Sequence, residues 1–228
     1  MSSLTSTRTV TPIATTTYTA TATDANGCTA SHSITVTVTP PTPVSVVATA
    51  TSASQVQLSW TMPGLADSFE VERRAPGGGF VHHHTTATAT TSVTLSATAD
   101  TAYLYRVRAV KSGTRSAPSN ADLATTIVFS GTITPGGSVL SALHVTQLRS
   151  AVNAGRALWS SALAPAVFTD SSLQNVVAKA VHITELRAVL DEARAGLALP
   201  PVGYSTTGPA AGQMITAAEI NDLRGGVR

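Results

Sequence analysis

A six-residue motif that recurs three times carries the side chains with the clearest potential for binding chemistry. The copies are His144-Val-Thr-Gln-Leu-Arg149, His182-Ile-Thr-Glu-Leu-Arg187 and Glu219-Ile-Asn-Asp-Leu-Arg224. Two imidazoles and three guanidinium groups at equivalent positions could form a ladder of ligands that grips an anionic polymer. The candidate binding residues are therefore His144, Arg149, His182, Arg187 and Arg224.

The same positions also have a structural interpretation. Glu219 takes the histidine position in the third copy, and glutamate is a standard capping residue at a helix N-terminus. The arginines would then pair with carboxylates one helical turn away, for example Arg187 with Asp191. We favour this interpretation and keep the binding ladder as the alternative.

A histidine run and a lone cysteine form the second set of candidates. On a strand, His82 and His84 would share a face and offer two imidazoles to a metal ion, but no third ligand is evident. We therefore expect an exposed strand and no metal site. The single cysteine, Cys28, would need a base to act as a nucleophile, and His32 lies beyond a turn. We expect an unreactive structural thiol.

Motifs for catalysis and cofactor binding are absent from the sequence. There is no Gly-x-Ser-x-Gly elbow, no phosphate-binding glycine loop and no calcium-binding loop. The twelve carboxylates include no pair placed for acid–base catalysis. We predict a non-enzymatic chain that uses no cofactor.

Helices must position the recurring motif. Apolar residues follow helical spacing in every copy: Val145, Leu148 and Val152; Ile183, Leu186 and Leu190; Ile220, Leu223 and Val227. Ser141 and Thr216 are placed as N-caps, while the second copy has the weaker Lys179 there. Gly196 and the prolines after it predict the end of the middle helix.

The period of the motif defines the architecture of residues 127–228. An aromatic residue precedes each copy, at Phe129, Phe168 and Tyr204, and the copies recur about every 37–38 residues. Each unit is predicted as a loop followed by one helix. One helical stripe cannot bury itself, so we expect the three units to pack into a small all-α region.

Residues 44–126 show short alternating segments at the spacing of a β-sandwich. The segments Val56-Gln-Leu-Ser-Trp60, Phe69-Glu-Val-Glu-Arg73 and Tyr103-Leu-Tyr105-Arg-Val-Arg-Ala each put apolar residues on one face. Together with Ser116-Ala-Pro-Ser-Asn120, they resemble a fibronectin type III domain over about residues 42–126. The resemblance implies seven strands, a core tryptophan at Trp60 and a tyrosine corner at Tyr103. The alternation places Tyr105 on the same face as Tyr103.

Residues 1–39 contain one predicted β-hairpin, and the proline-rich residues 40–43 form a linker. Alternating residues flank the Asn26-Gly27 turn. The hairpin resembles the last two strands of bacterial immunoglobulin-like or PKD-like repeats, where the cysteine after Asn-Gly often has a partner in an early strand. Since early strands and a partner for Cys28 are missing, we expect a truncated longer protein. The alternative is a half-domain completed by a neighbouring chain.

The composition of the chain limits the classes of function that we expect. Only 11% of the 228 residues are charged, and the formal net charge is +2. The basic residues are scattered and not interleaved with aromatics, so nucleic-acid binding is not expected. No apolar run has transmembrane length. The threonine- and serine-rich composition is typical of secreted proteins, although no signal peptide begins the chain.

The helical repeats are similar to His-Ile-Thr-Glu-Leu-Arg repeats at the C-terminal ends of large secreted proteins of environmental bacteria. The expected chain is therefore multidomain: a partial immunoglobulin-like hairpin and a fibronectin type III sandwich, both all-β, followed by three helical repeats. We predict a structural or attachment segment of an extracellular bacterial protein, secreted or at the cell surface. Its expected partners are a cell-envelope component or other protein chains. The alternatives are a polysaccharide-binding accessory segment of a secreted hydrolase, and a filament subunit completed by strand exchange.

Overall fold

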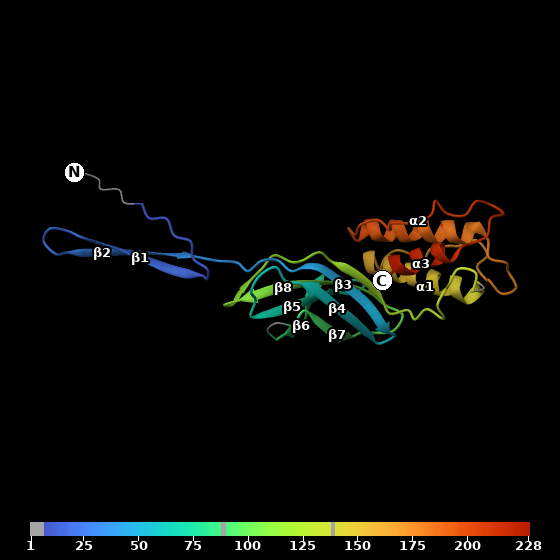
Figure 1. The fold of residues 1–228 in the computed structure, drawn as a ribbon, viewed down its shortest axis with the longest axis horizontal. Coiled ribbons are helices and arrows are strands. Elements are labelled where there is room, and N and C mark those ends of the chain that lie inside the picture. The colour runs from blue at the N-terminus through green and yellow to red at the C-terminus, as the bar shows by residue number, and fades with distance from the viewer. Residues whose placement is uncertain (1–6, 88–89, 138–139) are drawn as a thin grey trace.

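The computed structural model describes residues 7–87, 90–137 and 140–228. Figure 1 shows a hairpin, a β-sandwich and a group of three helices arranged along one long axis. The β-rich part therefore precedes a C-terminal region of three helices, as predicted. Within the described residues, no helix is long and apolar enough to span a membrane.

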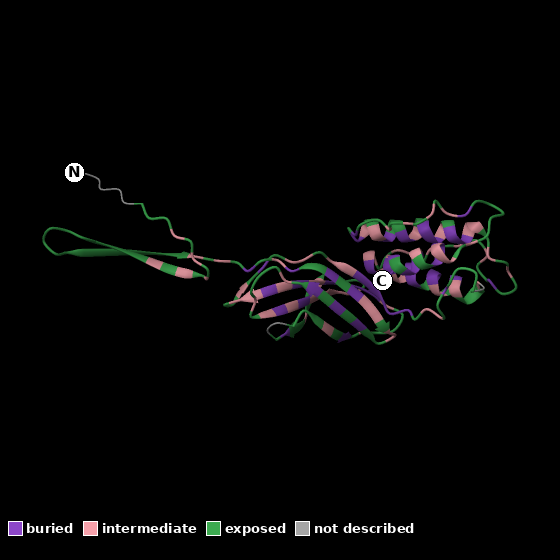
Figure 2. Ribbon diagram, viewed as in Figure 1, coloured by how far each residue is buried: buried purple, intermediate pink, exposed green. Residues whose placement is uncertain are grey.

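The hairpin pairs β1 (Thr16–Thr23) with β2 (Thr29–Val36) along their full length. The Asp24 carboxylate accepts the backbone N–H groups of Asn26 and Cys28, and Gly27 adopts a φ of 85° that closes the turn. Nearly all hairpin residues are exposed (Figure 2), and so is Cys28. No third strand pairs with the hairpin within the described residues.

The sandwich consists of two antiparallel sheets. One sheet has the order β3-β4-β7, and the other has the order β10-β8-β5-β6, with β9 paired to β8. The strands are β3 (Val44–Ser52), β4 (Gln55–Thr61), β5 (Ser68–Arg74), β6 (Phe80–Thr86), β7 (Ser92–Ser96), β8 (Ala102–Lys111), β9 (Thr114–Arg115) and β10 (Asp122–Thr125).

The three aromatic residues predicted to be structural lie in the core between these sheets. Trp60 meets Phe69 edge to face, with 5.2 Å between the ring centroids. The Tyr103 hydroxyl accepts the backbone N–H of Thr98 at 3.2 Å, across the corner that leads into β8. Tyr105 is fully buried, and this burial raises its pKa to about 12.

A β-bulge changes the geometry of the histidine run. Val71 of β5 pairs with His84 of β6, but its neighbour Glu72 pairs with His82, so His83 is an extra residue. Adjacent residues of a strand face opposite sides of the sheet. His82 and His84 therefore lie on opposite faces, and the expectation that they share one was wrong.

Three helices form the C-terminal region: α1 (Ala142–Trp159), α2 (Ala180–Gly196) and α3 (Ala217–Gly226). Their N-caps are Ser141, Lys179 and Thr216, at the predicted positions. The apolar stripes of all three helices pack into one core. Each helix therefore contributes the face that its repeat pattern predicts.

The helices are parallel to one another. Gly155 of α1 faces Ala193 of α2, and Arg156 forms an ion pair with Glu192, so equivalent positions of neighbouring units lie side by side. Gly226 of α3 likewise approaches Leu190 of α2. All three helices begin at the end of the molecule far from the hairpin (Figure 1).

The C-terminal ends of α1 and α2 lie on the sandwich. In β8, Tyr103 and Tyr105 face the sandwich core, whereas Leu104 faces outwards into a second buried cluster. This junction cluster consists of Ala102, Leu104 and Leu123 from the sandwich and Leu158, Leu197 and Leu199 from the helical region. Arg74 of β5 adds hydrogen bonds to the carbonyl oxygens of Leu158 and Trp159. The sandwich and the helices therefore share buried apolar surface.

The end of α2 depends on close packing. Gly196 is the last helical residue, as predicted, but it does not have a left-handed conformation. Instead, a Cβ on Gly196 would lie 2.2 Å from the Trp159 ring, whereas a Cβ on Gly155 would lie an ordinary 3.7 Å from Ala193. Glycine at 196 is therefore required by the tryptophan ring.

The two glycines predict opposite effects of alanine substitution. Gly155→Ala should raise the free energy of unfolding by about 0.4–1 kcal/mol, because alanine favours a helix and fits the space. Gly196→Ala should lower it by about 1–3 kcal/mol, because the methyl group displaces the Trp159 ring. Urea denaturation measures both changes, and equal effects of the two substitutions would contradict the close contact.

Candidate functional site

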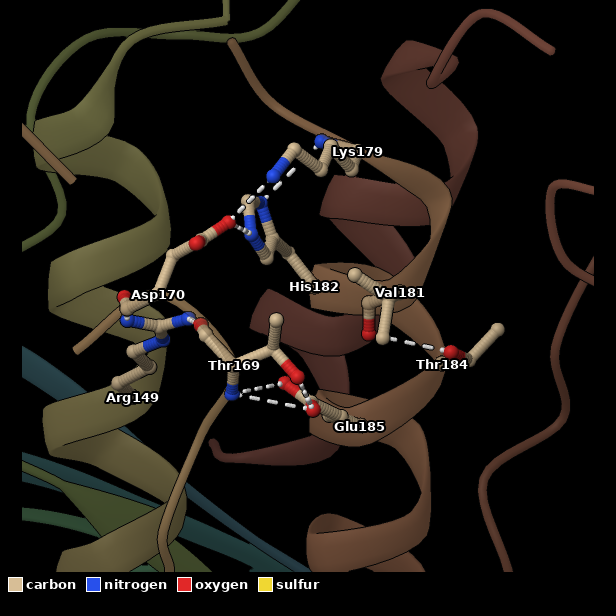
Figure 3. Close-up of polar contacts among 8 residues, drawn as sticks. All are labelled: Arg149, Thr169, Asp170, Lys179, Val181, His182, Thr184 and Glu185. Carbon is tan, nitrogen blue, oxygen red and sulfur yellow. Dashed lines mark hydrogen bonds and ion pairs between the residues drawn. The ribbon is translucent and has the colours of Figure 1, made fainter. Parts of the chain in front are cut away.

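The recurring motif lies in the first turns of each helix. Its first and fourth positions contact the segment that precedes the same helix, and its last position contacts the loop of another unit. Figure 3 shows the second copy, in which side chains of α2 converge on Thr169 and Asp170 of the loop before α2. The candidate site is therefore a helix start and a loop joined by polar contacts. Equivalent contacts of the first, fourth and last motif positions occur in all three units.

The first motif position caps the helix. The Nδ1 atoms of His144 and His182 accept the backbone N–H groups of Ser141 and Lys179, at 3.1 and 3.2 Å. Glu219 Oε2 accepts the N–H of Thr216 at 2.7 Å. Imidazole and carboxylate thus satisfy the same otherwise unpaired group at the start of a helix.

The side chain at the fourth motif position forms a hydrogen bond with the residue that follows the aromatic residue of the same unit. Side-chain oxygens of Gln147, Glu185 and Asp222 accept the backbone N–H groups of Ser130, Thr169 and Ser205, respectively. In the second and third units the carboxylate also accepts the Thr or Ser hydroxyl. We did not predict this role, although the recurring Ser or Thr after each aromatic residue was a usable signal.

The last motif position forms what we call the arginine clamp. Each guanidinium group stacks on an aromatic ring and donates hydrogen bonds to the loop beside that ring. The distances from Cζ to the ring centroid are 4.8 Å for Arg149 on Phe168, 4.3 Å for Arg187 on Tyr204 and 5.0 Å for Arg224 on Phe129. Planar guanidinium groups suit such combined stacking and forked donation.

The hydrogen bonds of the clamps go mainly to backbone carbonyls. Arg149 donates to the carbonyl oxygens of Asp170 and Thr169, at 2.9 and 2.7 Å. Arg224 donates to those of Gly131 and Ser130, at 2.8 and 3.0 Å. Arg187 donates to the carbonyl oxygen and the hydroxyl of Thr206, at 2.8 and 3.0 Å.

The clamps connect the three units in a closed cycle. Arg149 of the first unit holds the loop of the second, and Arg187 of the second holds the loop of the third. Arg224 of the third unit reaches back across the sequence to the loop of the first. The helical region is therefore a closed set of three units.

Asp170 lies where several contacts of the second unit meet (Figure 3). Its carboxylate oxygen Oδ2 lies 2.7 Å from Lys179 Nζ and 3.1 Å from His182 Nε2. Hydrogen bonds from Lys179 and His182 lower the pKa of this carboxyl group. Asp170 also has a left-handed backbone, with φ of 54°. The contacts to its side chain and carbonyl hold that conformation in place.

These contacts occupy the predicted binding side chains. Arg149, Arg187 and Arg224 are at most 8% exposed, and His182 is fully buried. The structure thus brings each predicted residue to a loop of this chain and does not assemble the five into one site. The Arg187–Asp191 ion pair is absent from the described residues. Asp191 instead accepts the Tyr204 hydroxyl at 2.9 Å.

The aromatic residues considered for sugar stacking are also engaged within the chain. Trp159 packs on Gly196 and on the junction cluster. Tyr204 stacks with Arg187, and burial, followed by its hydrogen bond to the Asp191 carboxylate, raises the pKa of Tyr204. Both rings are therefore partly covered by contacts within the chain.

Outside the recurring motif, the described residues offer few side chains for binding chemistry. Those residues contain no group of three side chains suited to hold a metal ion. A hollow of about 530 Å³ borders the third clamp, and its lining includes Phe129, Asn221 and Arg224. Asn221 and Arg224 donate to the carbonyl oxygens of Ile133 and Gly131, so they already have partners.

Comparison with known proteins identifies the domain family of the sandwich. Residues 39–122 match the family model of the fibronectin type III domain. The sandwich is a fibronectin type III domain. Such domains are typically non-catalytic. A search of curated proteins found no match.

Solved structures include similar fibronectin type III domains. One from human collagen XX is 27% identical, with a TM-score of 0.34, and the match covers 38% of this chain and 91% of that one. An Fn3-like protein from Clostridium thermocellum is 28% identical, with a TM-score of 0.34, over 39% of this chain and 94% of that one.

The clamp that closes the cycle predicts sensitivity to a conservative change. Arg224→Lys should lower the free energy of unfolding by about 1–3 kcal/mol, because lysine cannot stack on Phe129 and reach both carbonyl oxygens. Arg228→Lys, at the exposed C-terminus, is the matched control and should stay within about 0.5 kcal/mol of the unsubstituted chain. Urea denaturation makes the comparison, and equal stabilities of the two variants would contradict the clamp.

The first clamped helix also predicts a dependence on pH. Burial, and then the nearby Arg224 charge, lower the pKa of His144 below 6.5. The unfolded chain therefore gains a proton before the folded chain does, and stability should fall as the pH drops below 6.5. His144→Gln keeps an acceptor for Ser141 and cannot titrate. Its stability should fall less between about pH 7.5 and 5.5, and an unchanged slope in urea denaturation would contradict the assignment.

Proposed function

We propose that this chain is a non-catalytic structural and attachment segment of an extracellular bacterial multidomain protein. The observation that carries the proposal is the fixed junction between the fibronectin type III domain and the helical region. The hairpin lies at one end of the long axis and the helices lie towards the other (Figure 1). Such a body suits a spacer that presents its helical end at a defined orientation.

The junction supports a rigid spacer. Its buried cluster joins side chains of both parts, and the Arg74 hydrogen bonds cross from the sheet to the end of α1. Interfaces between domains usually permit relative motion unless they are well buried and apolar. Leu104, Leu123 and Leu158 are each at most 1% exposed, so separation would expose apolar side chains.

The repeat sequence supports attachment as the role of the helical region. Its motif is similar to repeats at the ends of large secreted bacterial proteins, where a module for docking or surface retention is expected. The arginine clamps use their donors within the chain, so attachment would use the outer surface of the closed set. The engaged Trp159 and Tyr204 rings make a polysaccharide-binding segment the weaker candidate.

Co-sedimentation with bacterial cell-envelope preparations tests the proposal. The fluorescently labelled chain should pellet with the envelope fraction and stay in the supernatant without it. An unrelated fibronectin type III domain is the control, because it lacks the helical region. A chain that remains in the supernatant with every envelope fraction would contradict attachment, and so would equal pelleting of the control.

A further inference from the structure

The three parallel helices begin at one end of the helical region, and the loops before them form the surface at that end. We call this the distal surface and define it by residues 131–137, 171–178 and 207–214. The loop contacts described above fix its base: the clamps hold Gly131, Asp170 and Thr206, one in each loop. The helix ends that contact the fibronectin type III domain lie at the opposite end.

The distal surface carries no formal charge. None of its residues is acidic, basic or histidine; they are mainly glycine, proline, hydroxyl, amide and small apolar residues. The neighbouring Asp170 and Lys179 pair with each other at 2.7 Å. Partial positive charge at the helix starts is reduced near this surface by the Asp170 and Glu219 carboxylates.

Two large apolar side chains project from this surface at equivalent repeat positions. Val177 is 81% exposed and Met214 is 88% exposed, and each stands five residues before the first motif position of its unit. In the sequence of the first unit, Val139 occupies that position. Single exposed apolar residues are ordinary. These exposed side chains recur at one repeat position and belong to none of the buried clusters.

We propose that the distal surface binds the distal surface of a second copy of this chain, with the two helical regions meeting end to end around a two-fold axis. Depletion of charged residues and enrichment of methionine mark the centres of protein–protein interfaces. A two-fold contact requires a patch that is complementary to itself, and an uncharged patch meets its own copy without ion-pair repulsion. Together the three loops contain roughly as many residues as each side of a standard interface, which is about 20–30.

Sedimentation velocity of the full chain at increasing concentration tests the proposal. The unsubstituted chain should form a dimer. The double variant Val177→Lys and Met214→Lys should weaken this dimer at least about a hundredfold, because it places like charges across the two-fold axis. Both positions are exposed, so the variant should keep the circular dichroism spectrum of the unsubstituted chain.

Val167→Lys is the matched control, because Val167 is an exposed apolar residue of the helical region outside the distal surface. It should dimerise like the unsubstituted chain. A chain that stays monomeric up to millimolar concentration overturns the proposal. If the double lysine variant dimerises as tightly as the unsubstituted chain, the proposal is also overturned. The dimer contact would then lie elsewhere on the chain, such as at the hairpin. Envelope binding is measured separately, so either proposal can fail alone.

Discussion

The arginine clamp is the interaction on which the helical region depends, because its three helices are parallel. A connection between parallel helices must run back along the full length of the bundle, which for α1 is about 27 Å at 1.5 Å per residue. Such a long irregular segment has many backbone polar groups to satisfy and few regular partners. The clamps of Arg149 and Arg187 each supply two donors and an aromatic contact partway along such a connection. The Arg224 clamp does the same for the segment that leads from the fibronectin type III domain into α1. The buried Nε atom of each clamp arginine has no hydrogen-bond partner within the described residues, so the terminal nitrogens and the ring contact hold each guanidinium group.

Closure of the cycle explains how three short units form a stable body. Open repeat arrays need capping units with polar outer faces. Here Arg224 holds the loop that begins the region, so the first and third units complete each other. The apolar residues at the C-terminal ends of α1 and α2 are covered by the outer face of the fibronectin type III domain, through Leu104 and Leu123. The fibronectin type III domain therefore covers one end of the helical region. The two parts form one rigid body, and the distal surface lies at its other end.

Much of this fold could be predicted from local patterns, and the parts that could not depend on contacts distant in sequence. Alternation and helical spacing identify the strands and helices because those periods are intrinsic to each element. The bulge at His83 changes register by one residue and leaves no pattern in the alternation. The partners of Arg187 could not be inferred from the sequence. Every residue of a loop carries a carbonyl oxygen, so no residue type marks the one that accepts the hydrogen bond. Leu104 did give a signal: an apolar residue between Tyr103 and Tyr105 faces away from the sandwich core and requires a second cover.

A double-mutant cycle between Arg224 and Phe129 tests the clamp most directly. Arg224→Lys, Phe129→Leu and the double variant are compared with the unsubstituted chain by urea denaturation. If the stacked clamp closes the cycle, the two substitutions should be coupled by about 1–2 kcal/mol, since each removes the same interaction. Effects that add to within about 0.3–0.5 kcal/mol would show that arginine and ring act independently, and would contradict the clamp as the constraint on which this structure depends.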